Sequence, residues 1–144
     1  MRLEAFRVQN YKKVADTGWI TCRDLTAFVG KNEAGKSAIF RGLSKLNPSD
    51  GEKYDGLKEF PRRRYTEEFK LQDWPVASGR FEINNEERST LATICDALKD
   101  IKKVTITRRY SWSTDVEFSP EPSLPEITRQ TLVDAVQNVK KVIQ

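Results

Sequence analysis

One run of residues has the types and the spacing that capture phosphate groups. Gly30 and Gly35 enclose four residues, and Lys36 and Ser37 follow directly, which matches the pattern G-x-x-x-x-G-K-[ST]. The two glycines let backbone N–H groups turn inward around a phosphate. Lys36 adds a full positive charge for the β- and γ-phosphates, and the Ser37 hydroxyl is a ligand for Mg²⁺. The motif therefore predicts ATP and Mg²⁺ as ligands, with Lys36 in the catalytic role.

The four fixed positions of this motif seldom coincide by chance. With ordinary amino-acid usage, the four fixed positions coincide at roughly 4 in 100,000 starting points, so a chain of this length holds the pattern by chance in well under about 1% of cases. The residues that we expect to bind the nucleotide are Gly30, Lys31, Asn32, Glu33, Ala34, Gly35, Lys36, Ser37 and Ala38, with Ser37 as the metal ligand.

The segments on either side of the loop are those that a phosphate-binding loop needs. Residues 25–29 form a compact apolar run that ends at Gly30, which predicts a fully buried parallel strand. From Lys36 onward, apolar residues recur at offsets of three and four, which predicts an amphipathic helix that ends at Asn47-Pro48. A helix that begins at the loop adds the partial positive charge of its N-terminus to the phosphate site.

The chain divides into three parts. Residues 1–47 predict a strand–loop–helix unit, with earlier strands around Phe6 and Ile20. Residues 48–75 combine prolines and glycines with many charges, which predicts a loop or an insertion. Residues 76–144 predict a β-hairpin among helices. The fold class is therefore α/β, a P-loop NTPase with an antiparallel β subdomain.

The third part has four expected elements, each read from its apolar spacing. They are a strand at 76–83, a helix that Asn84 or Asn85 caps and that carries Leu91, Ile94, Leu98 and Ile101, a hairpin of strands at 104–110 and 115–118, and a last helix with Leu132, Val136, Val139 and Ile143.

Composition limits the classes of function. Hydrophobic residues make up 38% of the chain and charged residues 32%, and the net charge is +4, which permits contact with nucleic acid without demanding it. No apolar run approaches the roughly 20 residues of a membrane span, and no signal-peptide pattern opens the chain, so we expect a cytoplasmic protein without a membrane partner. The absence of histidine excludes histidine-dependent triads and general bases. Cys22 and Cys95 lack metal-type spacing.

Two segments together resemble a known group of ATPases. The stretch RLEAFRVQNYK at 2–12 and the stretch LTAFVGKNEAGKSAIFRGL at 25–43 are similar to the N-terminus of the SMC-like and RecF-like ABC ATPases. That group includes the overcoming-lysogenization-defect (OLD) family of ATP-dependent nucleases. Asn10-Tyr11-Lys12 matches the segment that precedes the loop in these families, and Asn32 matches the asparagine inside the loop. The resemblance covers residues 1–47.

The resemblance implies the N-terminal lobe of an ABC-type ATPase head. Asn32 would border the γ-phosphate, and Lys12 or Lys13 would reach the nucleotide or DNA, unless they form only a solvated turn. The resemblance also implies a homodimer through the ATPase head, and DNA as a partner in repair or anti-phage defence.

Some parts of such a head are missing from the sequence. Hydrolysis in these families needs a Walker B strand that ends in Asp-Glu, and neither Asp134 nor Asp96 follows a suitable apolar strand. The signature motif is also absent. Gln72 is a candidate for the glutamine that senses Mg²⁺, but a plain loop glutamine is the simpler interpretation. We therefore expect the chain to be the first lobe of a longer protein, which holds a triphosphate without cleaving it alone.

Alternatives remain open at this point. The loop also fits a small P-loop kinase, or a non-catalytic interaction module that has no affinity for nucleotide. The run Arg62-Arg63-Arg64-Tyr65 fits contacts with DNA phosphates, and Tyr65 and Trp74 could stack on bases, but a solvated loop and packing residues are the simpler interpretations.

Overall fold

The computed structural model describes residues 1–30, 35–48 and 51–122, which fold around one antiparallel sheet. The strands are β1 (Arg2–Tyr11), β2 (Val14–Asp16), β3 (Ile20–Thr21), β4 (Pro75–Glu82), β5 (Lys103–Arg109) and β6 (Thr114–Ser119). The helices are α1 (Lys36–Ser44), α2 (Gly56–Glu59), α3 (Arg62–Glu68) and α4 (Asn85–Ile94), with short 3₁₀ turns η2 (Phe69–Leu71) and η3 (Asp96–Leu98). The strand order is β2-β1-β4-β5-β6, with β3 paired to β1. Every pairing among these strands is antiparallel.

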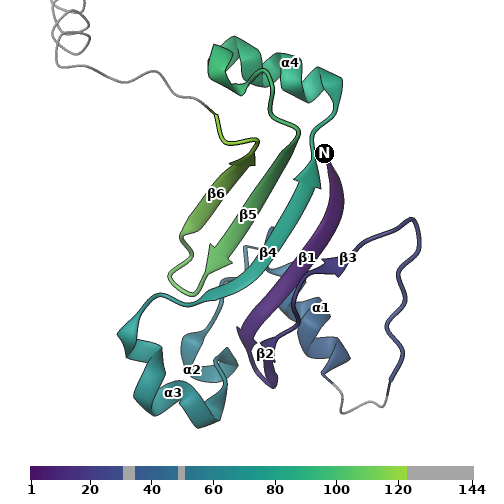
Figure 1. The fold of residues 1–144 in the computed structure, drawn as a ribbon. Coiled ribbons are helices and arrows are strands. Elements are labelled where there is room, and N and C mark those ends of the chain that lie inside the picture. The colour runs from purple at the N-terminus through teal and green to yellow at the C-terminus, as the bar shows by residue number, and fades with distance from the viewer. Residues whose placement is uncertain (31–34, 49–50, 123–144) are drawn as a thin grey trace, which may run out of the picture.

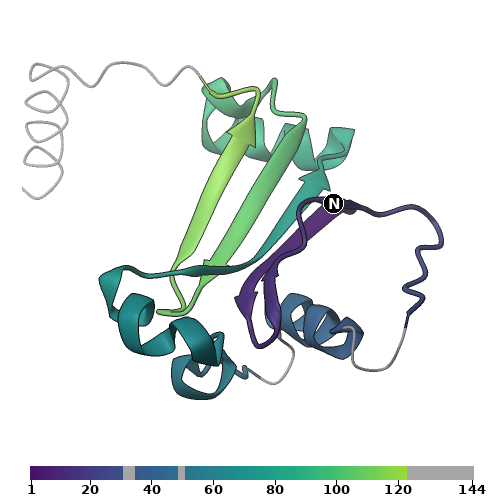
Figure 2. The same cartoon turned by 60° about the horizontal axis from the view of Figure 1, so that its bottom comes forward.

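The helices lie on one face and at the two ends of this sheet (Figure 1). Helix α1 packs against β1 and β4, while α2 and α3 lie at one end and α4 lies at the opposite end. Gly42 makes the close approach of α1 to β1 feasible, because an added Cβ there would lie only 2.8 Å from Val8 Cγ1. Figure 2 shows the same layers after a rotation of the molecule.

The main core lies between the sheet, α1 and the segment that carries α2 and α3. Its largest fully buried side chains include Tyr11, Phe60, Val8 and Val76. Aromatic rings fill the part of this core next to α2 and α3, where Phe60 contacts Tyr110 with 5.7 Å between the ring centroids. Burial of such rings is a large apolar contribution to stability, and it ties residues 54–74 to β1 and β5.

Several predicted elements are confirmed. The strand at 76–83 is β4, and the predicted hairpin is β5 and β6, paired from Lys103↔Ser119 to Arg108↔Thr114. Asn84 caps α4 through a capping box, in which its side chain accepts from Glu87 N while the Glu87 carboxylate accepts from Asn84 N. The mixture of helices and strands is also confirmed, although the described sheet is antiparallel throughout.

The buried parallel strand predicted at residues 25–29 is wrong. This segment forms no strand, and Leu25 is 87% exposed and Val29 96% exposed. A buried parallel strand needs neighbours that accept its hydrogen bonds and cover both faces. In the described part of the chain, β1 already has β4, β2 and β3 as partners, so no strand position is left for residues 25–29 beside it.

Two further boundaries differ from the prediction. The segment 48–75, which the sequence predicts to be a loop or an insertion, contains the helices α2 and α3. Helix α2 begins there because the Asp55 side chain accepts hydrogen bonds from Leu57 N and Lys58 N. The helix after Asn84 ends at Ile94, so Leu98 falls in η3 and Ile101 lies beyond it in a separate small core. The predicted last helix at 132–143 lies outside the described residues. No helix among those described is long and apolar enough to span a membrane.

Candidate functional site

The end of the glycine loop has the geometry of a helix start. Gly35 is the N-cap of α1 with φ 85° and ψ 5°, in the left-handed region that favours glycine. The first helical hydrogen bond runs from Ile39 N to Gly35 O at 3.0 Å. The N–H groups of the first turn therefore have no acceptor inside the helix, and no side chain caps them. The first turn also lacks acidic residues, so this helix end suits an anion.

Lys36 connects the two ends of the loop. Its ammonium donates a hydrogen bond to the carbonyl oxygen of Gly30, so the side chain folds back across the loop. Ser37 is exposed, and Ala38 packs against the main core. The four loop residues between these ends, Lys31, Asn32, Glu33 and Ala34, lie outside the described residues. The structure thus brings together Gly30, Gly35 and Lys36.

The apolar segment before the loop is held by one residue. Phe28 packs against Phe6 of β1 and Phe40 of α1, with ring centroids 6.2 Å and 5.0 Å apart. Leu25, Val29 and Phe40 remain exposed at 87%, 96% and 49%. Leu25 and Val29 therefore lie open to solvent on either side of Phe28, which is the residue of this segment that packs against the core.

The tip of the hairpin between β1 and β2 lies beside the loop. An added Cβ on Gly35 would lie 3.8 Å from Val14 Cγ2, so the start of β2 contacts the start of α1. Lys12 and Lys13, the two lysines that the family resemblance singled out, form this tip. Lys12 has a left-handed φ of 53°, its N–H donates to Glu59 O at 2.5 Å, and Lys13 is exposed.

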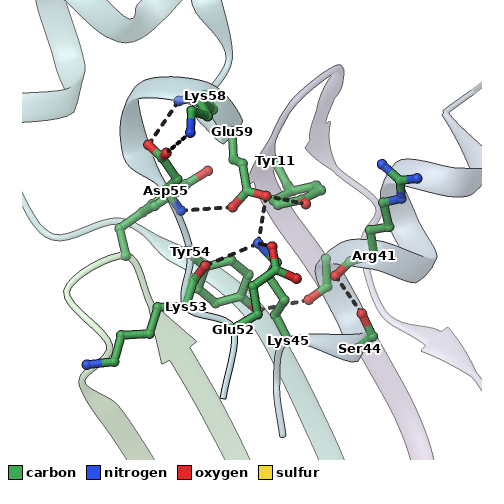
Figure 3. A network of polar contacts seen from close by, with 12 residues as sticks. Tyr11, Arg41, Ser44, Lys45, Glu52, Lys53, Tyr54, Asp55, Lys58 and Glu59 are labelled. Atoms are coloured by element: carbon green, nitrogen blue, oxygen red, sulfur yellow. Dashed lines mark hydrogen bonds and ion pairs between the residues drawn. The ribbon is translucent and has the colours of Figure 1, made fainter. Parts of the chain in front are cut away.

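A buried polar network lies at the C-terminal end of α1 (Figure 3), and the sequence pattern does not indicate it. Lys45, the C-cap of α1, donates to Glu59 Oε1 at 2.7 Å and to the Lys53 carbonyl at 3.1 Å. Tyr11 OH also donates to Glu59 Oε1, at 2.8 Å, and Asp55 N donates to Glu59 Oε2 at 2.9 Å. The Lys45 and Glu59 side chains are only 6% and 10% exposed. The network joins the hairpin tip, α1 and α2 at one carboxylate.

The electrostatics of this network favour the charged forms. Burial raises the pKa of Glu59, but the hydrogen bonds from Lys45, Asp55 N and Tyr11 outweigh it and hold that pKa below its ordinary value. Burial lowers the pKa of Lys45, and its bonds to Glu59 and Glu52 reverse the sign and raise it. Burial and the Glu59 carboxylate together raise the pKa of Tyr11 far above its ordinary value, so Tyr11 stays a neutral donor.

The remaining predicted residues lie apart from the loop or are used in packing. Asp96 begins η3 at the α4 end of the sheet, far from α1 (Figure 1), and Asp134 lies outside the described residues. Gln72 is exposed after η2. Tyr65 and Trp74 both pack inward. The Tyr65 ring stacks on Phe69 with 4.8 Å between the ring centroids, and the indole N–H of Trp74 donates to Glu68 O at 3.0 Å. The two rings therefore serve packing rather than stacking on nucleic-acid bases.

Cysteine and metal chemistry find no support in the described part of the chain. Cys22 and Cys95 are free and half-buried, and burial raises the pKa of the Cys22 thiol. Residues 1–30, 35–48 and 51–122 hold no group of three His, Cys, Asp or Glu side chains that could bind a metal ion. At the predicted site, Ser37 would offer Mg²⁺ a hydroxyl oxygen, together with water and the phosphates of a bound nucleotide.

Comparisons with known proteins leave the assignment to the chemistry of the site. No family model, no curated protein and no solved structure matches this chain.

Proposed function

We propose that the chain binds ATP with Mg²⁺ at residues 30–38, as the Walker A part of an SMC-like or OLD-like ATPase head. The observation that carries the proposal is the coincidence of the motif with a helix start at the expected residue, since α1 begins at Lys36 directly after a left-handed Gly35. Backbone N–H groups and the Lys36 ammonium would hold the β- and γ-phosphates, and Ser37 Oγ would complete the Mg²⁺ shell.

The exposed segment before the loop supports an incomplete head. In ATPases of this kind, the strand that leads into the loop lies inside a sheet, whereas Leu25 and Val29 are open to solvent here. Hydrolysis would then use a Walker B carboxylate and a signature motif that this sequence lacks, in a homodimer that closes around two ATP molecules. Action on DNA is part of this proposal and rests on the family resemblance.

Equilibrium dialysis of the purified chain against nucleotides tests the proposal. Because the loop addresses the β- and γ-phosphates, we expect ATP with Mg²⁺ to bind and AMP to bind far more weakly. Equal binding of ATP and AMP, or the absence of binding, would contradict it. Transfer of the γ-phosphate to a nucleoside or metabolite acceptor would instead support the small P-loop kinase. A chain with no nucleotide affinity that still holds a partner would be the non-catalytic module.

A further inference from the structure

The basic run in α3 divides into one arginine that packs inward and two that face solvent. Arg64 donates to the Glu68 carboxylate at 2.7 Å and to Asn10 Oδ1 at 2.9 Å, and its guanidinium lies 5.1 Å from the centre of the Trp74 ring. Arg62 and Arg63 are exposed, and neither has an ion pair with any described residue. The run therefore offers two arginines for a ligand rather than three.

A second pair of cations lies beside these two, although it is far away in the sequence. The hairpin tip that carries Lys12 and Lys13 is bonded to the end of α2 through Lys12 N and Glu59 O. Only Phe60 and Pro61 separate Glu59 from Arg62. Figures 1 and 2 both show the β1–β2 hairpin next to α2 and α3, at the same end of the sheet.

The acids of this end are mostly neutralised. Glu59 is buried against Lys45, and Glu68 is paired with Arg64. Of the carboxylates on α2 and α3, only Glu67 has no ion pair with a described residue. Glu52, which is 64% exposed, shares Lys45 with Glu59 and therefore adds a second acid to Glu67. The four exposed or half-exposed cations outnumber these two acids, which leaves a surface of positive potential.

We propose that this surface, formed by Lys12, Lys13, Arg62 and Arg63, binds the phosphate backbone of a nucleic-acid duplex. It deepens the proposed function, because it locates on this chain the DNA contact that the function requires. Arginine is suited to phosphate through its forked pair of donors. The aromatic residues nearby are packed into the core, so none of them stacks on bases, and the proposed contacts to phosphates carry no sequence information. The binding is therefore independent of sequence.

A membrane is a poorer partner for the same charges. Leu57 and Leu71 are exposed at this end, but a helix that lies in a membrane surface needs a long apolar face. Helix α2 has 4 residues and α3 has 7, and no residue of α3 is buried to mark a second, apolar side. The ligand that remains is a polyanion with closely spaced phosphates, such as a duplex.

The test is the salt dependence of duplex binding by the full chain, measured by fluorescence anisotropy on a short labelled DNA duplex without nucleotide. Four phosphate contacts predict a slope of log K against log salt near −3.6, at about −0.9 for each contact. Arg62→Ser with Arg63→Ser, or Lys12→Asn with Lys13→Ser, each reduces the slope by about 1.8. Near 0.1 M salt the affinity of each double variant falls by tens of fold, up to about 60-fold.

The matched control removes two cations from the α4 end, as Lys99→Ser with Lys102→Ser. The proposal is overturned if the control and the test variants lose the same amount of duplex affinity. It is also overturned if the slope of log K against log salt is the same in the wild type and the test variants, or if no variant alters duplex binding. Binding to vesicles that contain phosphatidylserine, with no binding to the duplex, overturns it as well. Lys36→Ala leaves duplex binding intact on this account, so failure of the surface and failure of the nucleotide site are separate results. Circular dichroism verifies that each variant is folded.

Discussion

Replacing Glu59 by Gln removes the negative charge at the centre of the buried network beneath α1. Its partner Lys45 is 6% exposed, so the remaining ammonium would stay buried with only the exposed Glu52 as counter-ion. Removal of one member of a buried ion pair destabilises by about 3–5 kcal/mol. The glutamine has a single acceptor oxygen, whereas Glu59 accepts on both, from Tyr11 and Lys45 on one and from Asp55 N on the other. We therefore expect a loss of about 3 kcal/mol.

Urea unfolding followed by circular dichroism measures this loss as a lower midpoint at constant slope. Glu52→Gln is the matched control, because it removes the other carboxylate bonded to Lys45 from a side chain that is 64% exposed. An exposed pair contributes less than about 1 kcal/mol, so the control should stay close to the wild type. If Glu59→Gln lies within about 1 kcal/mol of the wild type, or equals the control, the network does not hold these segments together.

The other predictions concern pH, packing and the metal. The folded-state pKa of Glu59 lies below its ordinary value of 4.5, so its contribution to stability is present above that pH and is lost as the pH falls through the folded-state value. Other carboxylates, such as Asp16 and Glu68, also have lowered pKa values, so both the wild type and Glu59→Gln lose stability in acid. The difference between their urea midpoints should therefore shrink from neutral to acid pH, and a constant difference would contradict the role of the Glu59 charge. Gly42→Ala should destabilise by about 1–3 kcal/mol in urea unfolding, because the new Cβ meets Val8 Cγ1 at 2.8 Å, and a gain in stability would contradict that contact. Ser37→Ala should abolish the increase in ATP affinity that Mg²⁺ produces, and full retention of that increase in a Mg²⁺ titration would remove Ser37 from the metal site.

Local patterns in the sequence predict the local structure well. The alternation at 104–110 and 115–118 gives a hairpin, and Asn84 with Glu87 gives a capping box, because both depend on residues that are near one another in the chain. The start of α1 at Lys36 also follows from local rules, since glycine adopts the left-handed turn at Gly35 without the steric cost that other residues meet there.

Contacts between distant residues are what the sequence does not predict. The apolar run at 25–29 has the composition of a buried strand, yet burial depends on neighbours, and the described sheet gives it none. Glu59 lies in a charged stretch and looks like a surface residue, but it is buried because Lys45 and Tyr11 come to it from other elements. Their spacing along the chain carries no periodic signal that could have indicated the network.

The measurement that tests the central claim most directly is isothermal titration calorimetry of ATP with Mg²⁺ into the wild type, Lys36→Ala and Arg41→Ala. Arg41 is an exposed cation on the same helix, so it controls for the loss of one positive charge. A charge-assisted contact to phosphate contributes about 1.5–3 kcal/mol, so Lys36→Ala should weaken binding at least about tenfold. Arg41→Ala should bind as the wild type does. Equal affinities of the wild type and Lys36→Ala, or a wild type that does not bind ATP, would contradict a phosphate site at residues 30–38.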